Sequence, residues 1–233
     1  MTRETFPREP AGATPTSRSA FDERFSDIAN RLVIGIARHW LALFNTAWGL
    51  YILLPLLAPV FMQLGLTTPA RLIYGVYSFL CHQLPDHSYF LFGTLGAPHL
   101  HELEATGMPA GLDLFSQRRF VGNELAGFKV ALCQRDLAIY GSVLAAGLVF
   151  ALVRGRLRPP SIKLYLLLLV PMAVDGITQM FGLRESDWFL RSLTGGLFGA
   201  ASVWLAYPYV EDAMRDVIAV EERRRDSPPP HQP

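Results

Sequence analysis

The chain alternates between long apolar blocks and short charged segments, and the block lengths predict its elements. A helix needs about 20 apolar residues to cross a bilayer. Four blocks are long enough, near residues 40–66, 137–153, 164–183 and 192–210. A fifth block at 70–84 is too short to cross, and it predicts a re-entrant or interfacial helix that dips into the membrane. The expected fold class is therefore all-α: a polytopic transmembrane helical bundle of about four spanning helices plus that short helix.

The segments around these blocks are polar and differ in pattern. Residues 1–20 are rich in Pro, Thr, Ser and Arg without apolar periodicity, which predicts a disordered tail. Residues 21–38 repeat apolar side chains every three or four positions, which predicts an interfacial helix. Residues 94–128 hold Gly, Pro and mixed charges, and we expect an outer loop there. Residues 211–233 predict a cytoplasmic helix with a Pro-rich tail, which leaves 39–210 as the transmembrane domain.

The placement of arginine predicts the orientation of the chain. The loop at 154–163 carries three arginines and one lysine without an acidic residue, and the positive-inside rule places it in the cytoplasm. Basic residues near both ends of the chain favour cytoplasmic N- and C-termini, which four crossings would satisfy. We therefore expect a multi-pass protein of the cell (inner) membrane, with its polar motifs at the outer end of the bundle.

Composition and the motif search exclude several classes of function. The formal net charge is only +1, and no basic groove with interleaved aromatic residues is visible, so nucleic acid is not an expected partner. Nucleotide-binding glycine motifs, the zinc-protease motif H-E-x-x-H and the hydrolase motif G-x-S-x-G are all lacking. The sequence therefore contains no recognisable catalytic set.

A polar group lies inside the third apolar block. Asp175, Thr178 and Gln179 stand at i, i+3 and i+4, so they share one helix face. A carboxylate in hydrocarbon is costly and normally faces a polar interior. It could pair with an arginine and hold helices in register, or it could serve a proton relay or a ligand. Arg184 and Arg191 follow in the next turn, which is either a solvated set of ion pairs or a clamp for an anion or head group.

A second group combines thiol, imidazole and carboxylate side chains: Cys81, His82, Cys133 and Asp136. All four are zinc ligands by chemical type, so zinc is the one cofactor that the sequence suggests. Cys81 and His82 are adjacent in sequence, which makes it difficult for both to bind one metal ion. The sequence also lacks the C-x-x-C pair that is typical of zinc sites. From the sequence we rank a Cys81–Cys133 disulfide first, a metal site second and two free thiols third.

Small residues spaced by four predict close packing of helices. Gly195 and Gly199 form a G-x-x-x-G pair at the start of the last apolar block. This pair could pack inside the chain, or form a homodimer or partner-subunit face. With four spans in one small chain, packing within the chain is the favoured interpretation.

Three motifs carry a resemblance to a known family. They are CHQLPDHSYF from Cys81, CQRDLAIYG from Cys133, and DGITQ from Asp175, continued by RES and RSLTG. Over roughly residues 70–205 the chain resembles an uncharacterised bacterial family of polytopic membrane proteins, domain of unknown function twenty eighty-five. The resemblance implies a small polytopic membrane protein and no established activity. It also implies a second Cys where Asp136 stands, so a zinc site here requires Asp136 to substitute for a thiolate.

Three hypotheses of function follow. The first is a non-catalytic accessory or assembly subunit of a larger membrane complex, whose partners are the bilayer and other membrane subunits or a second copy. The second is a membrane enzyme or binding protein for a lipid or small amphiphile, with a polar and metal-binding site at the outer end of the bundle. The third is a small transporter, which four spans without an inverted repeat make the weakest.

Overall fold

The computed structural model describes residues 17–226, and the side chains of 24–224. The predicted tail, except for its last four residues, and the Pro-rich end at 227–233 lie outside this range. The described chain forms two compact units, one from its two ends, up to Trp40 and from Ala213, and one spanning Leu41–Asp212. We describe each unit by itself.

The unit formed by the chain ends contains the first part of α1 (Ser17–Gln63) and the last part of α7 (Trp188–Asp226). Arg38 and Glu222 approach to 3.6 Å with both side chains more than half exposed, so this ion pair contributes little stability. The predicted interfacial helix 21–38 and the charged helix after residue 210 both lie in this unit. Neither is a separate element, because each continues without a break into the neighbouring apolar block.

Two prolines inside the first predicted span do not end the helix. Pro55 and Pro59 lie inside α1, which continues to Gln63. A proline removes one backbone donor from a helix, but flanking turns can continue it, as prolines in membrane helices commonly show. The helix also begins at Ser17, inside the segment predicted as a tail.

The membrane character of the chain rests on three helices. Within the described residues, Arg24–Gln63, α5 (Gln134–Val153) and α6 (Ile162–Met180) are long and apolar enough to cross a bilayer. They overlap the predicted spans 40–66, 137–153 and 164–183. The predicted span 192–210 lies in α7, which is not among the three, because glycine, serine and threonine dilute its apolar residues. The fourth crossing and the orientation therefore stay predictions.

A small sheet corrects the all-α prediction. Strands β1 (Ser88–Leu91), β2 (Gly122–Asn123) and β3 (Gly127–Cys133) form an antiparallel sheet in the order β1-β3-β2. The short elements η1 (Pro85–His87), α3 (Leu100–Ala105) and α4 (Leu114–Arg119) complete this region. The loop predicted at 94–128 is thus partly structured. All seven residues of β3 are buried, and a strand buried on both faces lacks the alternation that reveals a strand in sequence.

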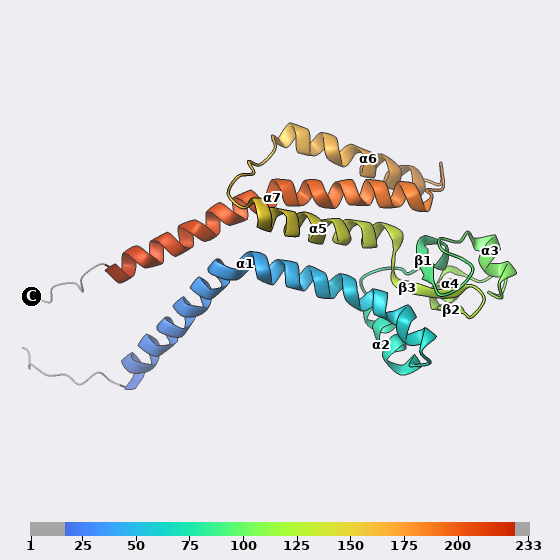
Figure 1. The fold of residues 1–233 in the computed structure, drawn as a ribbon, viewed down its shortest axis with the longest axis horizontal. Coiled ribbons are helices and arrows are strands. Elements are labelled where there is room, and N and C mark those ends of the chain that lie inside the picture. Colours follow the sequence, from blue (N-terminus) through green and yellow to red (C-terminus); the bar gives the residue numbers. More distant parts are fainter. Residues whose placement is uncertain (1–16, 227–233) are drawn as a thin grey trace, which may run out of the picture. The chain divides into compact units, whose positions relative to one another are not determined.

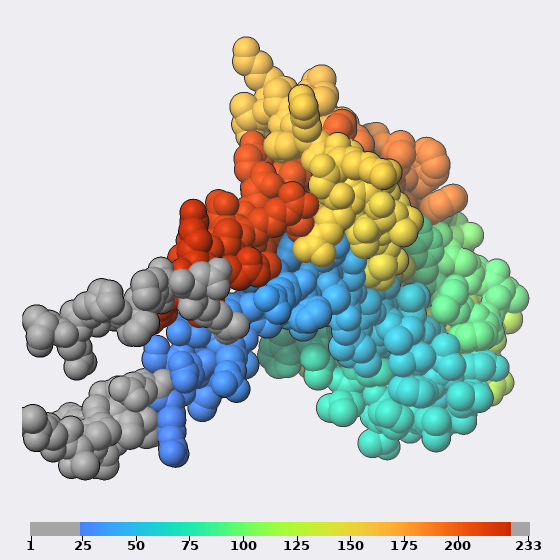
Figure 2. All heavy atoms as spheres, turned by 60° about the vertical axis from the view of Figure 1, so that its left-hand side comes forward, coloured from blue at the N-terminus to red at the C-terminus, as the bar shows by residue number. Residues whose placement is uncertain are grey.

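The helix α2 (Thr67–Tyr77) packs against the sheet and the end of α1. Its eleven residues span about 16 Å, which agrees with a helix too short to cross the core of about 30 Å. Figure 2 shows α2 and the residues after it, in cyan and teal, as one surface beside the blue of α1. Buried contacts among Ala58, Tyr77, Cys81 and Leu132 join these elements. They fix the segment that carries Cys81 against the strand that carries Cys133.

The helices α5, α6 and the first part of α7 run side by side (Figure 1). A Cβ added to Gly195 would lie 2.9 Å from the carbonyl oxygen of Arg135, and one added to Gly199 would overlap the backbone of Ile139. The G-x-x-x-G pair therefore packs against α5 of the same chain, as expected. Tyr165 of α6 meets Ser202 of α7 at 3.4 Å. We call the end where α5 begins, α6 ends and α7 begins the sheet end of the bundle.

Candidate functional site

Asp175 lies in the interior of the bundle at its sheet end. Only 2% of its surface is exposed, although it sits in a helix whose other side is apolar. Its two carboxylate oxygens accept hydrogen bonds from Arg135 at 2.7 Å and from Arg184 at 2.8 Å, and Thr194 adds a contact at 3.4 Å. One buried carboxylate thus holds two guanidinium groups, one from α5 and one from the turn after α6. Asp175 is therefore shielded from the apolar outer face of its helix, where an unpaired charge would be costly.

The other two predicted residues of this helix face differ in their contacts. Gln179 joins the Asp175 network, since its side-chain oxygen accepts a bond of 2.9 Å from Arg135. Thr178 does not join, because its hydroxyl donates to the carbonyl of Val174 in its own helix. The shared helix face therefore predicts only part of the site.

Arg191 is buried beside the network, but its hydrogen bonds go to residues other than Asp175. It is 6% exposed, and its NH1 group donates to the side-chain oxygen of Gln134 at 3.2 Å and to the carbonyl of Asp86 at 3.5 Å. Both acceptors are formally neutral. The arginine that pairs with Asp175 from the turn is Arg184 instead, whose side chain is half exposed.

Cys81, Cys133 and Asp136 form a compact group of ligand atoms. One atom from each lies within 4.8 Å of the other two. The Nδ1 atom of His82 lies 3.9 Å from the sulfur of Cys81, so the two adjacent side chains place their ligand atoms close together. Both cysteines are buried free thiols in the structure, and the disulfide stays a prediction.

Local backbone geometry holds this group together. Cys133 is the last residue of β3 and the N-cap of α5, where its sulfur accepts the backbone N–H of Asp136 at 3.4 Å. The backbone N–H of Cys133 in turn donates to the sulfur of Cys81 at 3.4 Å. Each sulfur thus accepts one backbone N–H, and such donors favour the thiolate form.

The pKa values of the two thiols shift in opposite directions. A hydrogen bond from Cys133 lowers the pKa of Cys81, and the same contact raises the pKa of Cys133. The bond to Cys81 also raises the pKa of His82. The arrangement therefore favours a thiolate on Cys81 beside a protonated partner, which is the form that binds metals and reacts with electrophiles.

A cavity of about 310 Å³ joins the ligand group to the arginine network. It is lined by five of the predicted site residues, by Arg135, which pairs with Asp175, and by His87, which was not predicted as a site residue. The side chains that line it include His82, His87, Cys133, Arg135, Asp136, Gln179 and Arg191. The two polar motifs, which lie about 40 residues apart in the chain, thus open onto one space.

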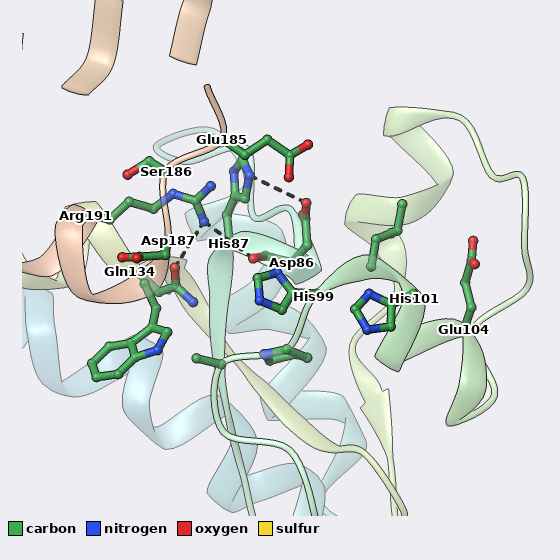
Figure 3. A pocket seen from close by; sticks show the side chains of 14 residues that line it. Asp86, His87, His99, His101, Glu104, Gln134, Glu185, Ser186, Asp187 and Arg191 are labelled. Atoms are coloured by element: carbon green, nitrogen blue, oxygen red, sulfur yellow. Dashed lines mark hydrogen bonds and ion pairs between the residues drawn. The ribbon is translucent and has the colours of Figure 1, made fainter. Parts of the chain in front are cut away.

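A second cavity of about 510 Å³ adjoins the first, because His87 and Arg191 line both. Figure 3 shows Arg191, Gln134 and Ser186 at one side of it, next to Asp86 and His87. His99, His101 and Glu104 lie across from them. His87 and Asp86 approach to 3.5 Å, and burial lowers the pKa of His87. Asp86, Gln134 and Ser186 lie within the three family motifs, but no spacing pattern in the sequence marks them as site residues.

Comparison with known proteins supports the membrane assignment. The family model described as "Predicted membrane protein (DUF2085)" matches residues 117–205. An uncharacterized protein of the archaeon Methanocaldococcus jannaschii is 32% identical over 160 residues, which make up 65% of this chain and 80% of that protein. Its source shows that the resemblance extends beyond bacteria. No solved structure matches the chain.

Proposed function

This chain belongs to the DUF2085 family of predicted membrane proteins, and we propose that it is a metal-dependent protein that binds a lipid or small amphiphile at the sheet end of its bundle. The observation that carries the proposal is the ligand group. Donor atoms of Cys81, Cys133 and Asp136 lie within 4.8 Å of one another. Cys133 and Asp136 line the cavity of about 310 Å³, and Cys81 is buried beside Cys133.

The donor set fits zinc. Two zinc–sulfur bonds of about 2.3 Å at a tetrahedral angle place the sulfur atoms about 3.8 Å apart, so the group needs only a small contraction. The separation of 3.9 Å between the Cys81 sulfur and the His82 nitrogen also suits two ligands of one ion. Asp136 stands where the family resemblance implies a cysteine, and a carboxylate oxygen is itself a zinc ligand. Two thiolates, an imidazole and a carboxylate would hold the ion.

The surroundings of this group support a ligand that is part polar and part apolar. The cavity beside Cys133 and Asp136 is also lined by Arg135, Gln179 and Arg191. The helices that frame it expose apolar side chains along their outer faces, as lipid-facing helices do. A head group can therefore enter the cavity while its chains stay in the bilayer.

The residues have distinct parts in such a site. A zinc ion held by all four donors would have no open position, so its part would be to fix the segments that carry Cys81 and Cys133 beside the cavity. Arg135 and Gln179 offer donors to the ligand's polar group, and Asp175 holds Arg135 and Arg184 in place through its two oxygens. Asp175 is itself buried, which strengthens its contacts relative to the same contacts in water.

Metal analysis of the purified protein tests the proposal. We expect about one zinc per chain after purification in mild detergent without chelator, and loss of that zinc in Cys133→Ser and Asp136→Asn. His101→Ala is the matched control, since His101 lies outside the ligand group and should keep its zinc. Native mass spectrometry of the same sample should show a retained amphiphile. A metal-free protein with both thiols titratable, or with a Cys81–Cys133 disulfide, would overturn the metal proposal.

The accessory-subunit hypothesis, which the sequence alone ranks first, gains nothing further from the site. Its support remains the lack of a catalytic motif. A partner that co-purifies in fixed ratio would favour it, and the same mass spectra would reveal such a partner. The transporter hypothesis likewise keeps only its sequence argument.

A further inference from the structure

Three buried polar atoms around the larger cavity have no hydrogen-bond partner among the described residues. They are Nε of Arg191, the hydroxyl oxygen of Ser186 and one carboxylate oxygen of Asp86, and all three residues line the cavity of about 510 Å³. Arg191 and Ser186 are only 6% and 4% exposed. Buried polar groups are nearly always satisfied in folded proteins, so a cluster of exceptions around one cavity points to a ligand.

Two of these atoms form a donor pole. The guanidinium of Arg191 is a buried cation whose bonds go to two neutral oxygens, on Gln134 and on the backbone of Asp86. Arg135 and Arg184, by contrast, bind the carboxylate of Asp175. A buried arginine without a bonded carboxylate, next to a free hydroxyl on Ser186, is suited to an anionic oxygen of a phosphate or carboxylate.

The third atom, the free carboxylate oxygen of Asp86, is a hydrogen-bond acceptor and forms an acceptor pole. Asp86 directs one oxygen to His87 at 3.5 Å, and its other oxygen is buried without a donor. Three further carboxylates line the same cavity: Glu104, Glu185 and Asp187. A ligand that carries only negative charge would be repelled by these carboxylates. A positively charged N–H group would instead donate a hydrogen bond to the free oxygen of Asp86.

We propose that this cavity binds a zwitterion that joins an anionic group to a primary ammonium, as in a phosphoethanolamine head group. The anion lies against Arg191 and Ser186, and the ammonium donates to Asp86 (Figure 3). A trimethylated ammonium has no N–H to donate and is the weaker ligand. This inference rests on the proposed function, since it names the head group of the amphiphile that the site binds.

The aromatic residues at the mouth favour a lipid as the source of this group. Trp188 lines the cavity and is 48% exposed, and its neighbour Phe189 is 58% exposed at the start of α7. Tryptophan is enriched at the level of lipid head groups, where one side of its ring meets hydrocarbon and the other meets water. The cavity therefore lies where a head group would enter.

Calorimetry on the full-length protein in detergent tests the proposal with soluble probes. We expect phosphoethanolamine to bind more tightly than phosphocholine, which lacks the N–H donor, and than glycerol 3-phosphate, which lacks the amine. Native mass spectrometry from nanodiscs with equal phosphatidylethanolamine and phosphatidylcholine tests the lipid source. Retention of the ethanolamine lipid there assigns the group to a lipid, and binding of the soluble probe alone assigns it to a free metabolite. Equal affinity for all three probes, or binding of none, would overturn the proposal.

Two conservative variants separate recognition from folding. Ser186→Ala removes a hydroxyl that bonds to no described residue, so the melting temperature should hold while affinity for phosphoethanolamine falls about tenfold, the value of one hydrogen bond to a charged group. Asp86→Asn should abolish the preference over phosphocholine. Asp212→Asn, a matched change at an exposed carboxylate, should alter neither. Unchanged affinity and preference in both site variants would refute the assignment of the two poles.

The outcomes distinguish this inference from the metal proposal. Zinc content depends on Cys133 and Asp136, which do not line the larger cavity, so both head-group variants should keep their metal. A protein without zinc that still prefers phosphoethanolamine would sink the metal proposal alone. A zinc-loaded protein without that preference would sink the head-group assignment alone.

Discussion

Replacing Asp175 by Asn removes the only charge that the described structure places between Arg135 and Arg184. The amide keeps the shape of the carboxylate, but its NH2 group must face one of the two guanidinium groups that the oxygens now accept at 2.7 and 2.8 Å. Removing one partner of a buried ion pair leaves an uncompensated charge and costs about 3–5 kcal/mol. Because Arg135 and Arg184 are 23% and 50% exposed, both can turn toward water, so we expect the lower end, about 3 kcal/mol.

Thermal unfolding in detergent measures this effect. For a chain of this size, about 3 kcal/mol corresponds to a fall in melting temperature of roughly 6–12 °C. Asp212→Asn is the matched control, since the same chemical change at an exposed carboxylate should stay within about 0.5 kcal/mol. The double variant with Arg135→Gln should cost less than the sum of the single changes, by about 1 kcal/mol or more. A wild-type melting temperature for Asp175→Asn would refute the view that this carboxylate holds α5, α6 and the following turn together.

Three further outcomes follow from the same structure. Gly199→Leu should destabilise the protein by about 1–3 kcal/mol, because the new side chain meets the backbone of Ile139, whereas Gly141→Leu, where a Cβ meets nothing within 4 Å, should be mild. Burial lowers the pKa of Lys129 from an ordinary 10.5 to about 7, so the unfolded chain binds more protons than the folded chain between pH 7 and pH 10.5. The free energy of unfolding should therefore rise with pH across that window. A melting-temperature series should show a flatter rise for Lys129→Met. A chelator should lower the melting temperature of the wild type but not of Cys133→Ser, as a thermal scan of both would show.

Sequence reasoning succeeds where one physical term dominates. The cost of placing charge or unpaired backbone in hydrocarbon forces long apolar helices, and α5 and α6 match their predicted spans to within a few residues. The same cost required that Asp175 face the interior, where it lies. Small residues at Gly195 and Gly199 predicted the close approach of α7 to α5. In each case the prediction depends on a pattern of residues close together in the sequence.

The parts that could not be predicted depend on contacts between distant segments. The sheet was missed because β3 is buried on both faces, which removes the alternation of a half-buried strand. Cys133 and Asp136 stand one turn apart, but Cys81 joins them only through the packing of α2 and β3. An arginine partner was foreseen for Asp175, but the sequence did not show that Arg135 and Arg184 would share it while Arg191 donates to Gln134.

X-ray absorption at the zinc edge of the purified protein tests the central claim most directly. The account predicts two sulfur neighbours at about 2.3 Å, with the remaining ligands being nitrogen or oxygen at about 2.0 Å. It also predicts that Asp136→Cys, which restores the cysteine implied by the family resemblance, raises the sulfur count to three. A zinc-free sample, or zinc without sulfur neighbours, would contradict the proposed metal centre.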